Sequence, residues 1–289
     1  MKTSRKKLIS TFFKIGISVF LLYFVFTKIS FGDIWGSIKN VKLHFLILAI
    51  LFFLLSQWIS AKRLLLFFKE TGFNLSNNSN NTLYLIGMFY NFFIPGGIGG
   101  DAYKVFILNK KFKWNLKTLT TAVFIDRFMG LTAIGILISI LGYNLLSFTS
   151  LIWLIPIAII LIIGVSYFII KRFFSKFRNI FSKTLGISLL VQLLQITSVV
   201  CIIMSLNNDS NYINYIVIFL ISSVLSIFSF SGIGIREYIF YEASILLGID
   251  AEIAVSIGLL FSTITAVISL FGIIFHFKKY ELQLSDNSI

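Results

Sequence analysis

Long runs of apolar residues, separated by short basic or polar stretches, fill most of the 289 residues. Several runs reach roughly 20 residues, the length that an α-helix needs to cross the hydrocarbon core of a membrane. The pattern therefore predicts an all-α integral membrane protein with two segments interrupted by glycine or proline. The six full spans are expected at residues 9–30, 41–61, 117–142, 151–171, 184–206 and 252–276, and the interrupted segments at 83–112 and 212–248.

The two interruptions resemble each other. The first reads Pro-Gly-Gly-Ile-Gly-Gly-Asp at residues 95–101, and the second reads Gly-Ile-Gly-Ile-Arg-Glu at residues 232–237. Their Gly-Ile-Gly triplets are 135 residues apart, and a Leu-Leu-x-Gln match between 54–57 and 189–192 has the same offset. Broken apolar segments at matching places in two halves are typical of a transporter with a site at the bilayer midplane. Chance similarity in a biased composition is the alternative.

The positions of Lys and Arg predict a topology. Basic stretches lie at the N-terminus and near residues 62–69, 104–117, 171–183 and 278–279, which we expect to be loops, as we do the polar stretch 71–82. If the first interrupted segment enters and leaves from the cytoplasm and the second from outside, every one of these basic stretches is cytoplasmic. We therefore expect one membrane domain, 1–289, with inverted repeats at about 1–142 and 143–289. It should be a multi-pass protein of the inner (plasma) membrane with both termini cytoplasmic.

Composition excludes several classes of protein. Only 12% of residues are charged and 57% are apolar, whereas soluble domains carry about 25% charged residues. The net charge of +14 follows the positive-inside pattern and does not indicate nucleic-acid binding. His44 and His276 have no Cys, His or carboxylate companions at ligand spacing, so no metal is expected. The glycine-rich stretch lacks the Gly-Lys-Ser/Thr of a nucleotide-binding loop, and we expect no cofactor.

The first glycine-rich turn is a candidate binding site. Glycines leave backbone amides uncovered, and Asp101 is expected to cap the helix that follows, a place that suits a phosphate headgroup. Alternatively, the glycines only shape the hairpin. If the two turns approach each other, Asp101 and Arg236 are expected to pair, because an unpaired ion in the membrane is costly. Such a pair could be structural, substrate-binding or switchable.

A second candidate lies inside the predicted span 117–142, where Asp126 and Arg127 are adjacent. Neighbouring residues of a helix point about 100° apart, so each needs a partner elsewhere. An interior arginine suits a bidentate grip on phosphate. Snorkelling to the surface is the alternative for Arg127. The polar face with Ser188 and Gln192 either lines a pathway or bonds helices together.

Thirteen residues follow from these considerations as candidates for substrate binding. They are Tyr90, Asn91, Pro95, Gly97, Gly99, Gly100, Asp101, Asp126, Arg127, Gly232, Gly234, Arg236 and Glu237. No nucleophile–base pair is apparent, and no catalytic residue is predicted.

Three blocks together resemble the lysylphosphatidylglycerol synthase transmembrane, or flippase-like, family. They are the sequences from Asn91 to Lys104, Asp126-Arg-Phe-Met-Gly-Leu, and Ser231-Gly-Ile-Gly-Ile-Arg-Glu. The resemblance extends over nearly the whole chain. It implies a membrane part that moves lipid, to which two-domain members add a soluble domain that transfers lysine from charged tRNA to phosphatidylglycerol. The sequence ends at Ile289, and we expect that transferase domain to be absent.

The leading hypothesis is a translocator for a polar or glycosylated phospholipid, with an anionic or lipid-linked substrate. The first alternative is a membrane-embedded transferase acting on a lipid-linked donor, such as a lysyltransferase. The second is a non-catalytic partner of an envelope-biosynthesis transferase.

Overall fold

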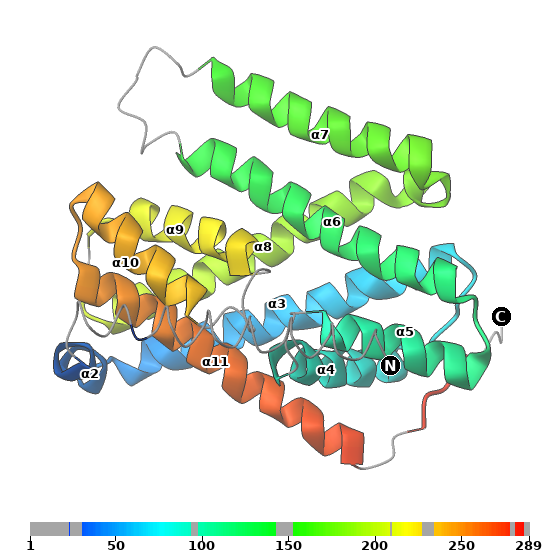
Figure 1. Ribbon diagram of the computed structural model, residues 1–289, viewed down its shortest axis with the longest axis horizontal. Coiled ribbons are helices and arrows are strands. Elements are labelled where there is room, and N and C mark those ends of the chain that lie inside the picture. The colour runs from blue at the N-terminus through cyan, green and yellow to red at the C-terminus, as the bar shows by residue number, and fades with distance from the viewer. Residues whose placement is uncertain are drawn as a thin grey trace.

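The computed structural model describes Tyr23 and residues 31–93, 98–142, 153–208, 210–226, 234–277 and 281–285. Within these residues the regular elements are helices (Figure 1). In chain order they are α2 (Phe31–Lys39), α3 (Leu43–Glu70), α4 (Asn77–Phe93), α5 (Gly99–Phe112), α6 (Leu116–Leu141), α7 (Leu154–Phe173), the 3-10 helix η3 (Ser175–Ile180), α8 (Phe181–Ser205), α9 (Tyr212–Leu225), α10 (Ile235–Leu247) and α11 (Ala251–Phe277). The all-α prediction is confirmed for this part of the chain.

Five of these segments are long and apolar enough to cross a membrane. They are Leu43–Glu70, Leu116–Leu141, Leu154–Phe173, Ser175–Ser205 and Ala251–Phe275. Each overlaps one of the predicted full spans. The remaining predicted span, 9–30, lies almost wholly outside the described residues. The chain is thus a multi-pass membrane protein, although the number of spans and their orientation stay predictions.

Each predicted interrupted segment corresponds to two shorter helices, α4 with α5 and α9 with α10. The residues between them, 94–97 and 227–233, lie outside the described residues, and with them Pro95, Gly97 and Gly232. The helix breaks therefore fall where the glycines predicted them.

Two expected loops are helical instead. The basic stretch 62–69 belongs to α3, and α4 begins at Asn77 inside the polar stretch 71–82. Those loop assignments were wrong. Arg63 is buried in α3 although its charge predicted exposure, because the side chain has a charged partner in another helix. Ser76 helps to start α4, since its hydroxyl accepts a hydrogen bond from the backbone N–H of Ser79.

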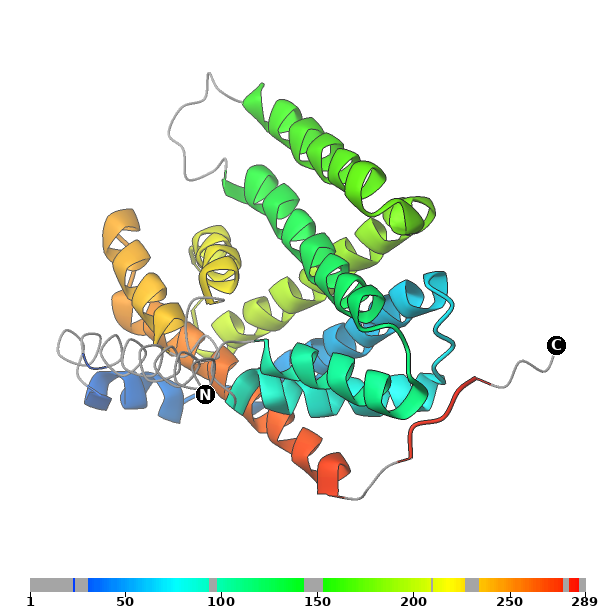
Figure 2. The ribbon, with the colours of Figure 1, turned by 45° about the vertical axis from the view of Figure 1, so that its right-hand side comes forward.

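Helices α3 and α8 pack along each other at the centre of the molecule (Figures 1 and 2). Helices α9, α10 and α11 gather at one end of this pair, and α4 and α5 at the other. Small residues bring the central backbones together: the hydroxyl of Ser198 in α8 donates to the carbonyl of Ala49 in α3 at 2.8 Å. Close packing through small residues and side-chain hydrogen bonds is typical of membrane helices.

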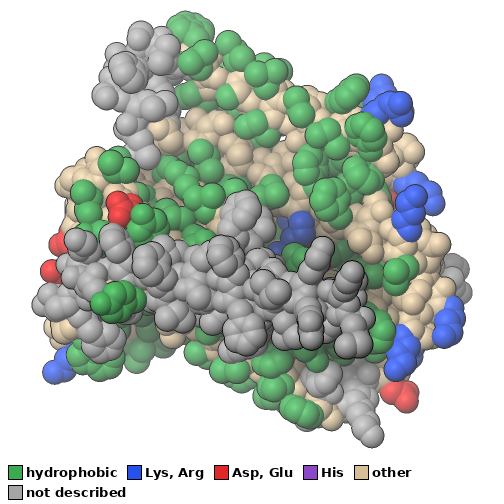
Figure 3. Space-filling view, viewed as in Figure 1, with side chains coloured by type: hydrophobic (Ala, Val, Ile, Leu, Met, Phe, Trp, Pro, Cys, Tyr) green, Lys and Arg blue, Asp and Glu red, His purple; other side chains and the backbone are tan. Residues whose placement is uncertain are grey.

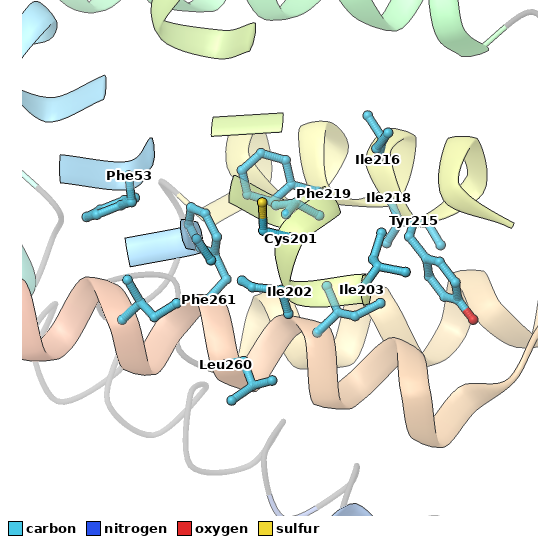
Figure 4. Packing of buried hydrophobic residues seen from close by; sticks show 14 of the residues in the cluster. Phe53, Cys201, Ile202, Ile203, Tyr215, Ile216, Ile218, Phe219, Leu260 and Phe261 are labelled. Atoms are coloured by element: carbon cyan, nitrogen blue, oxygen red, sulfur yellow. The ribbon is translucent and has the colours of Figure 1, made fainter. Parts of the chain in front are cut away.

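The larger core cluster joins α3, α8, α9 and α11. Figure 4 shows Phe219 and Phe261 meeting within it, with Cys201 and Ile202 of α8 alongside. The Phe261 ring contacts both Phe53 and Phe219 edge-on, with ring centroids 5.5 and 4.7 Å apart. These contacts fix α11 against the rest of the core.

The outer surface of the molecule is apolar. Helices α6 and α7 project from the body as a pair (Figures 1 and 2), and α7 exposes the large side chains of Ile160, Leu161 and Phe168. In Figure 3 hydrophobic side chains cover much of the face in view, while most Lys and Arg side chains lie at its edge. An exposed apolar surface of this kind requires a lipid environment.

Candidate functional site

Asp101 lies in the first turn of α5 and binds two cations. Its Oδ1 accepts from Lys104 Nζ at 3.1 Å, and its Oδ2 accepts from Arg127 Nε at 2.9 Å. Asp101 and Lys104 are three residues apart on one face of α5, whereas Arg127 reaches across from α6. Both carboxylate oxygens are therefore engaged. We call Asp101, Lys104 and Arg127 the α5–α6 cluster; it carries two formal positive charges and one negative charge.

The two cations of the α5–α6 cluster differ in exposure. The Lys104 side chain is 4% exposed, and its Nζ lies 4.5 Å from the centroid of the Tyr84 ring. The Arg127 side chain is 53% exposed although it lies eleven residues into the membrane-length helix α6. Its terminal nitrogens have no hydrogen-bond partner among the described residues. Figure 3 shows a recessed Lys or Arg surface near the middle of the apolar face in view. Arg127 thus offers a free guanidinium edge at membrane depth.

Close backbone packing positions α5. Gly100 lies directly against the carbonyl group of Gly87 in α4, so a Cβ atom there would overlap it. The Gly100 N–H donates to Asn91 Oδ1 at 2.8 Å. We expected Asp101 to cap α5, and this was wrong: the side chain of Asn91 binds a free amide at the helix start, while Asp101 turns to its two cations. This exchange leaves Asp101 available to orient Arg127.

Asp126, the neighbour of Arg127, belongs to a different cluster. Arg63 of α3 donates through Nε to Asp126 Oδ1 at 2.7 Å and through Nη2 to Oδ2 at 3.3 Å. Its Nη1 donates to Ser188 Oγ of α8 at 2.8 Å. We call Arg63, Asp126 and Ser188 the three-helix cluster. All three residues are buried, so the cluster holds α3, α6 and α8 together.

Asp126 and Arg127 have separate partners, as expected from the 100° between neighbouring helix positions. Of the two roles weighed for the polar face of α8, Ser188 performs the bonding of helices, since its hydroxyl accepts from Arg63 in α3. The Gln192 side chain is also buried, and its Oε1 has no hydrogen-bond partner.

Arg236 and Glu237 begin α10 and are bridged by Ser262 of α11. The Ser262 hydroxyl accepts from Arg236 Nη1 at 3.2 Å and donates to Glu237 Oε1 at 2.8 Å. Glu237 Oε2 accepts from the backbone N–H of Gly234, which has a φ of +85°. We call Arg236, Glu237 and Ser262 the α10–α11 cluster. Arg236 also lies 4.8 Å from the centre of the Phe261 ring, and its buried Nε has no hydrogen-bond partner.

The expected ion pair between Asp101 and Arg236 is not formed in this structure. Asp101 is held by Lys104 and Arg127, and Arg236 by Ser262. The physical reason is distance along the fold: α5 packs against α4 and α6, whereas α10 packs against α9 and α11. Each half thus satisfies its charges locally.

The structure brings several other candidates to the α5–α6 cluster. Tyr90 and Tyr103 stack with ring centroids 4.5 Å apart, one on α4 and one on α5. Gly99 is the first residue of α5. Among the described residues, no group of three His, Cys, Asp or Glu side chains is arranged to hold a metal ion.

Sequence reasoning missed three functional side chains: Arg63, Lys104 and Ser262. Lys104 carried a usable signal, since its i+3 spacing from Asp101 predicts contact on a helix. Arg63 was taken for part of a cytoplasmic loop. Ser262 has no distinguishing pattern in a chain with many serines in apolar helices.

Long apolar helices, a lipid-compatible surface and buried charge clusters define a multi-pass helical membrane protein. The family described as the lysylphosphatidylglycerol synthase TM region matches residues 11–272. The chain belongs to this family, as its three sequence blocks indicated, and the family points to a lipid-related membrane function. No curated protein matches the chain.

Proposed function

We propose that this protein moves an anionic or lipid-linked phospholipid between the leaflets of the inner membrane. One observation carries the proposal: a half-exposed guanidinium, Arg127, is held by a buried carboxylate about 16 Å along a helix long enough to span the membrane. A charge at this depth is costly unless it has a function, and ionisable residues inside membrane helices often mark substrate pathways.

The mechanism that we propose uses two inverted repeats. Helix starts support it: α4 begins at Asn77 and α9 at Tyr212, while α6 begins at Leu116 and α11 at Ala251, and each pair is separated by 135 residues. The packing is also reciprocal, because α4 lies against α11 and its counterpart α9 lies against α6. Two halves related in this way can rock to expose one site alternately to each side.

In this mechanism the pairs α4–α5 and α9–α10 are re-entrant hairpins, one from the cytoplasm and one from outside, and both chain termini are cytoplasmic. The basic residues Lys110 and Lys111 at the end of α5 and Lys171 at the end of α7 suit the cytoplasmic side. Arg127 and Arg236 bind the lipid phosphate as it passes, and the lipid tails stay in the bilayer.

The test is lipid movement in proteoliposomes. Phosphatidylglycerol labelled on its acyl chain is incorporated with the purified protein, and label in the outer leaflet is quenched chemically. Protein-containing vesicles should lose nearly all fluorescence, whereas empty vesicles should lose about half. A loss of half with protein that elutes as a single folded species would contradict the proposal.

The matched variants are Arg127→Gln and Arg172→Gln. Arg127→Gln should slow the loss at least tenfold, because the free guanidinium edge is removed while Asp101 keeps Lys104 as a partner. Arg172→Gln changes an exposed arginine in the last turn of α7 and should leave the rate within twofold. Equal rates for the two variants would remove Arg127 from the pathway.

A further inference from the structure

We infer that the α5–α6 cluster selects an anionic phospholipid whose headgroup is uncharged, such as phosphatidylglycerol, and rejects the same lipid once its headgroup carries a cationic aminoacyl group. This inference rests on the proposed function for its transport arm, but its binding arm stands without it. It names the charge of the substrate at Arg127.

The first argument is the charge of the cluster. Asp101 offsets only one of its two cations, so the Asp101, Lys104 and Arg127 side chains leave an excess of one positive charge. Because the surroundings are apolar, this excess is weakly screened and attracts a monoanion. A phosphodiester supplies one negative charge, and the occupied site is then neutral.

The second argument is geometry. Asp101 accepts from Arg127 Nε, which leaves the edge formed by Nη1 and Nη2 free. Two parallel N–H groups on this edge match two oxygens of a phosphate, and such bidentate pairs are strong and directional. Lys104 is buried against Tyr84, so it contributes charge and does not compete for the ligand.

The third argument is the lack of a receptor for an ammonium group near Arg127. Both oxygens of Asp101 are bound by Lys104 and Arg127, and both oxygens of Asp126 are bound by Arg63. A headgroup amine entering here meets no free carboxylate among these residues and is repelled by the excess positive charge. Lysyl-phosphatidylglycerol has one phosphate and two amines, so its net charge is +1, and the cluster disfavours it.

The binding experiment offers the detergent-purified full-length protein an equimolar mixture of phosphatidylglycerol and lysyl-phosphatidylglycerol. Native mass spectrometry then counts each bound lipid. Phosphatidylglycerol should be bound at least tenfold more often. Arg127→Gln should abolish this preference, and Arg172→Gln should retain it. Arg127→Lys keeps the charge but loses the fork, so it should retain part of the preference.

The transport experiment compares acyl-labelled forms of the same two lipids in proteoliposomes. Phosphatidylglycerol should cross at least tenfold faster. If both lipids cross equally fast, or bind equally often, the inference is overturned while the proposed function stands. If phosphatidylglycerol binds selectively but neither lipid crosses, the proposed function fails and the selectivity of the site is upheld.

Discussion

Asp126 and Arg127 are adjacent in the chain, yet they belong to different clusters with different consequences. Asp126 is buried and tied to Arg63 and Ser188, whereas Arg127 is half exposed and free along one edge. The helix geometry explains the divergence, since one position of rotation turns the two side chains toward different neighbours. At the residue scale, Asp126 therefore maintains the fold and Arg127 is available for a ligand.

Replacing Arg63 by methionine should destabilise the protein by about 3–5 kcal/mol, because the buried Asp126 carboxylate loses its charged partner. The midpoint of thermal unfolding in detergent, followed by near-ultraviolet circular dichroism, measures the loss. The double variant Arg63→Met with Asp126→Leu should recover most of it, because no unpaired charge remains. Arg172→Met, on the exposed end of α7, serves as the control. No recovery in the double variant would mean that the ion pair itself is needed.

At the scale of elements, the α4–α5 pair depends on backbone contact. Gly100 rests on the Gly87 carbonyl, and Gly272 of α11 rests on the carbonyl of Leu85, so α4 is pressed between α5 and α11. Neither site has room for a side chain. This contact sets the position of Asp101 one residue later, and through it the orientation of Arg127.

Gly100→Ala should destabilise the protein by about 1–3 kcal/mol, since the new methyl group must displace backbone atoms. It should also reduce lipid movement, because Asp101 shifts with α5. Unfolding midpoints and the vesicle assay measure the two effects. Gly186→Ala is the matched control: it lies in α8 with nothing within 4 Å of an added Cβ, and should stabilise by up to about 1 kcal/mol. Equal effects of the two substitutions would contradict the close contact.

At the scale of the whole molecule, the end of the chain returns to the turn between α3 and α4. The Ser285 N–H donates to the Asn74 carbonyl and the Ser76 N–H donates to the Gln283 carbonyl, each at 3.0 Å. Leu282 is buried in the cluster that includes Phe68 and Leu75. Residues 281–285 therefore fasten the chain after α11 to the first half of the fold.

Leu282→Ala should release this segment, because truncation of a buried leucine costs about 2 kcal/mol or more and few other contacts hold it. Hydrogen exchange read by mass spectrometry should show faster exchange in peptides that contain Ser76 and Gln283. Leu284→Ala is the control, since Leu284 is 48% exposed and the same exchange should be unchanged. Unchanged protection in both variants would show that backbone pairing alone is sufficient.

Much of the architecture follows from the sequence. Predicted spans overlap α3, α6, α7, α8 and α11, and the glycine-rich stretches fall at the breaks of the two short helix pairs. These features depend on local hydropathy and on the conformational freedom of glycine, which neighbouring residues determine. The stretch around Arg63 was misread because a charge near a helix end looks the same whether it meets water or a carboxylate.

The sequence by itself determined that this is a helical membrane protein of the lysylphosphatidylglycerol synthase transmembrane family, and that Asp101, Asp126, Arg127 and Arg236 need partners. Only the tertiary structure decided which partners they have. Arg63 and Asp126 are 63 positions apart, and Asp101 and Arg127 are 26 apart. Contact across such separations depends on how each helix is rotated and where it crosses its neighbours, and those are set by packing between helices, which no local pattern encodes.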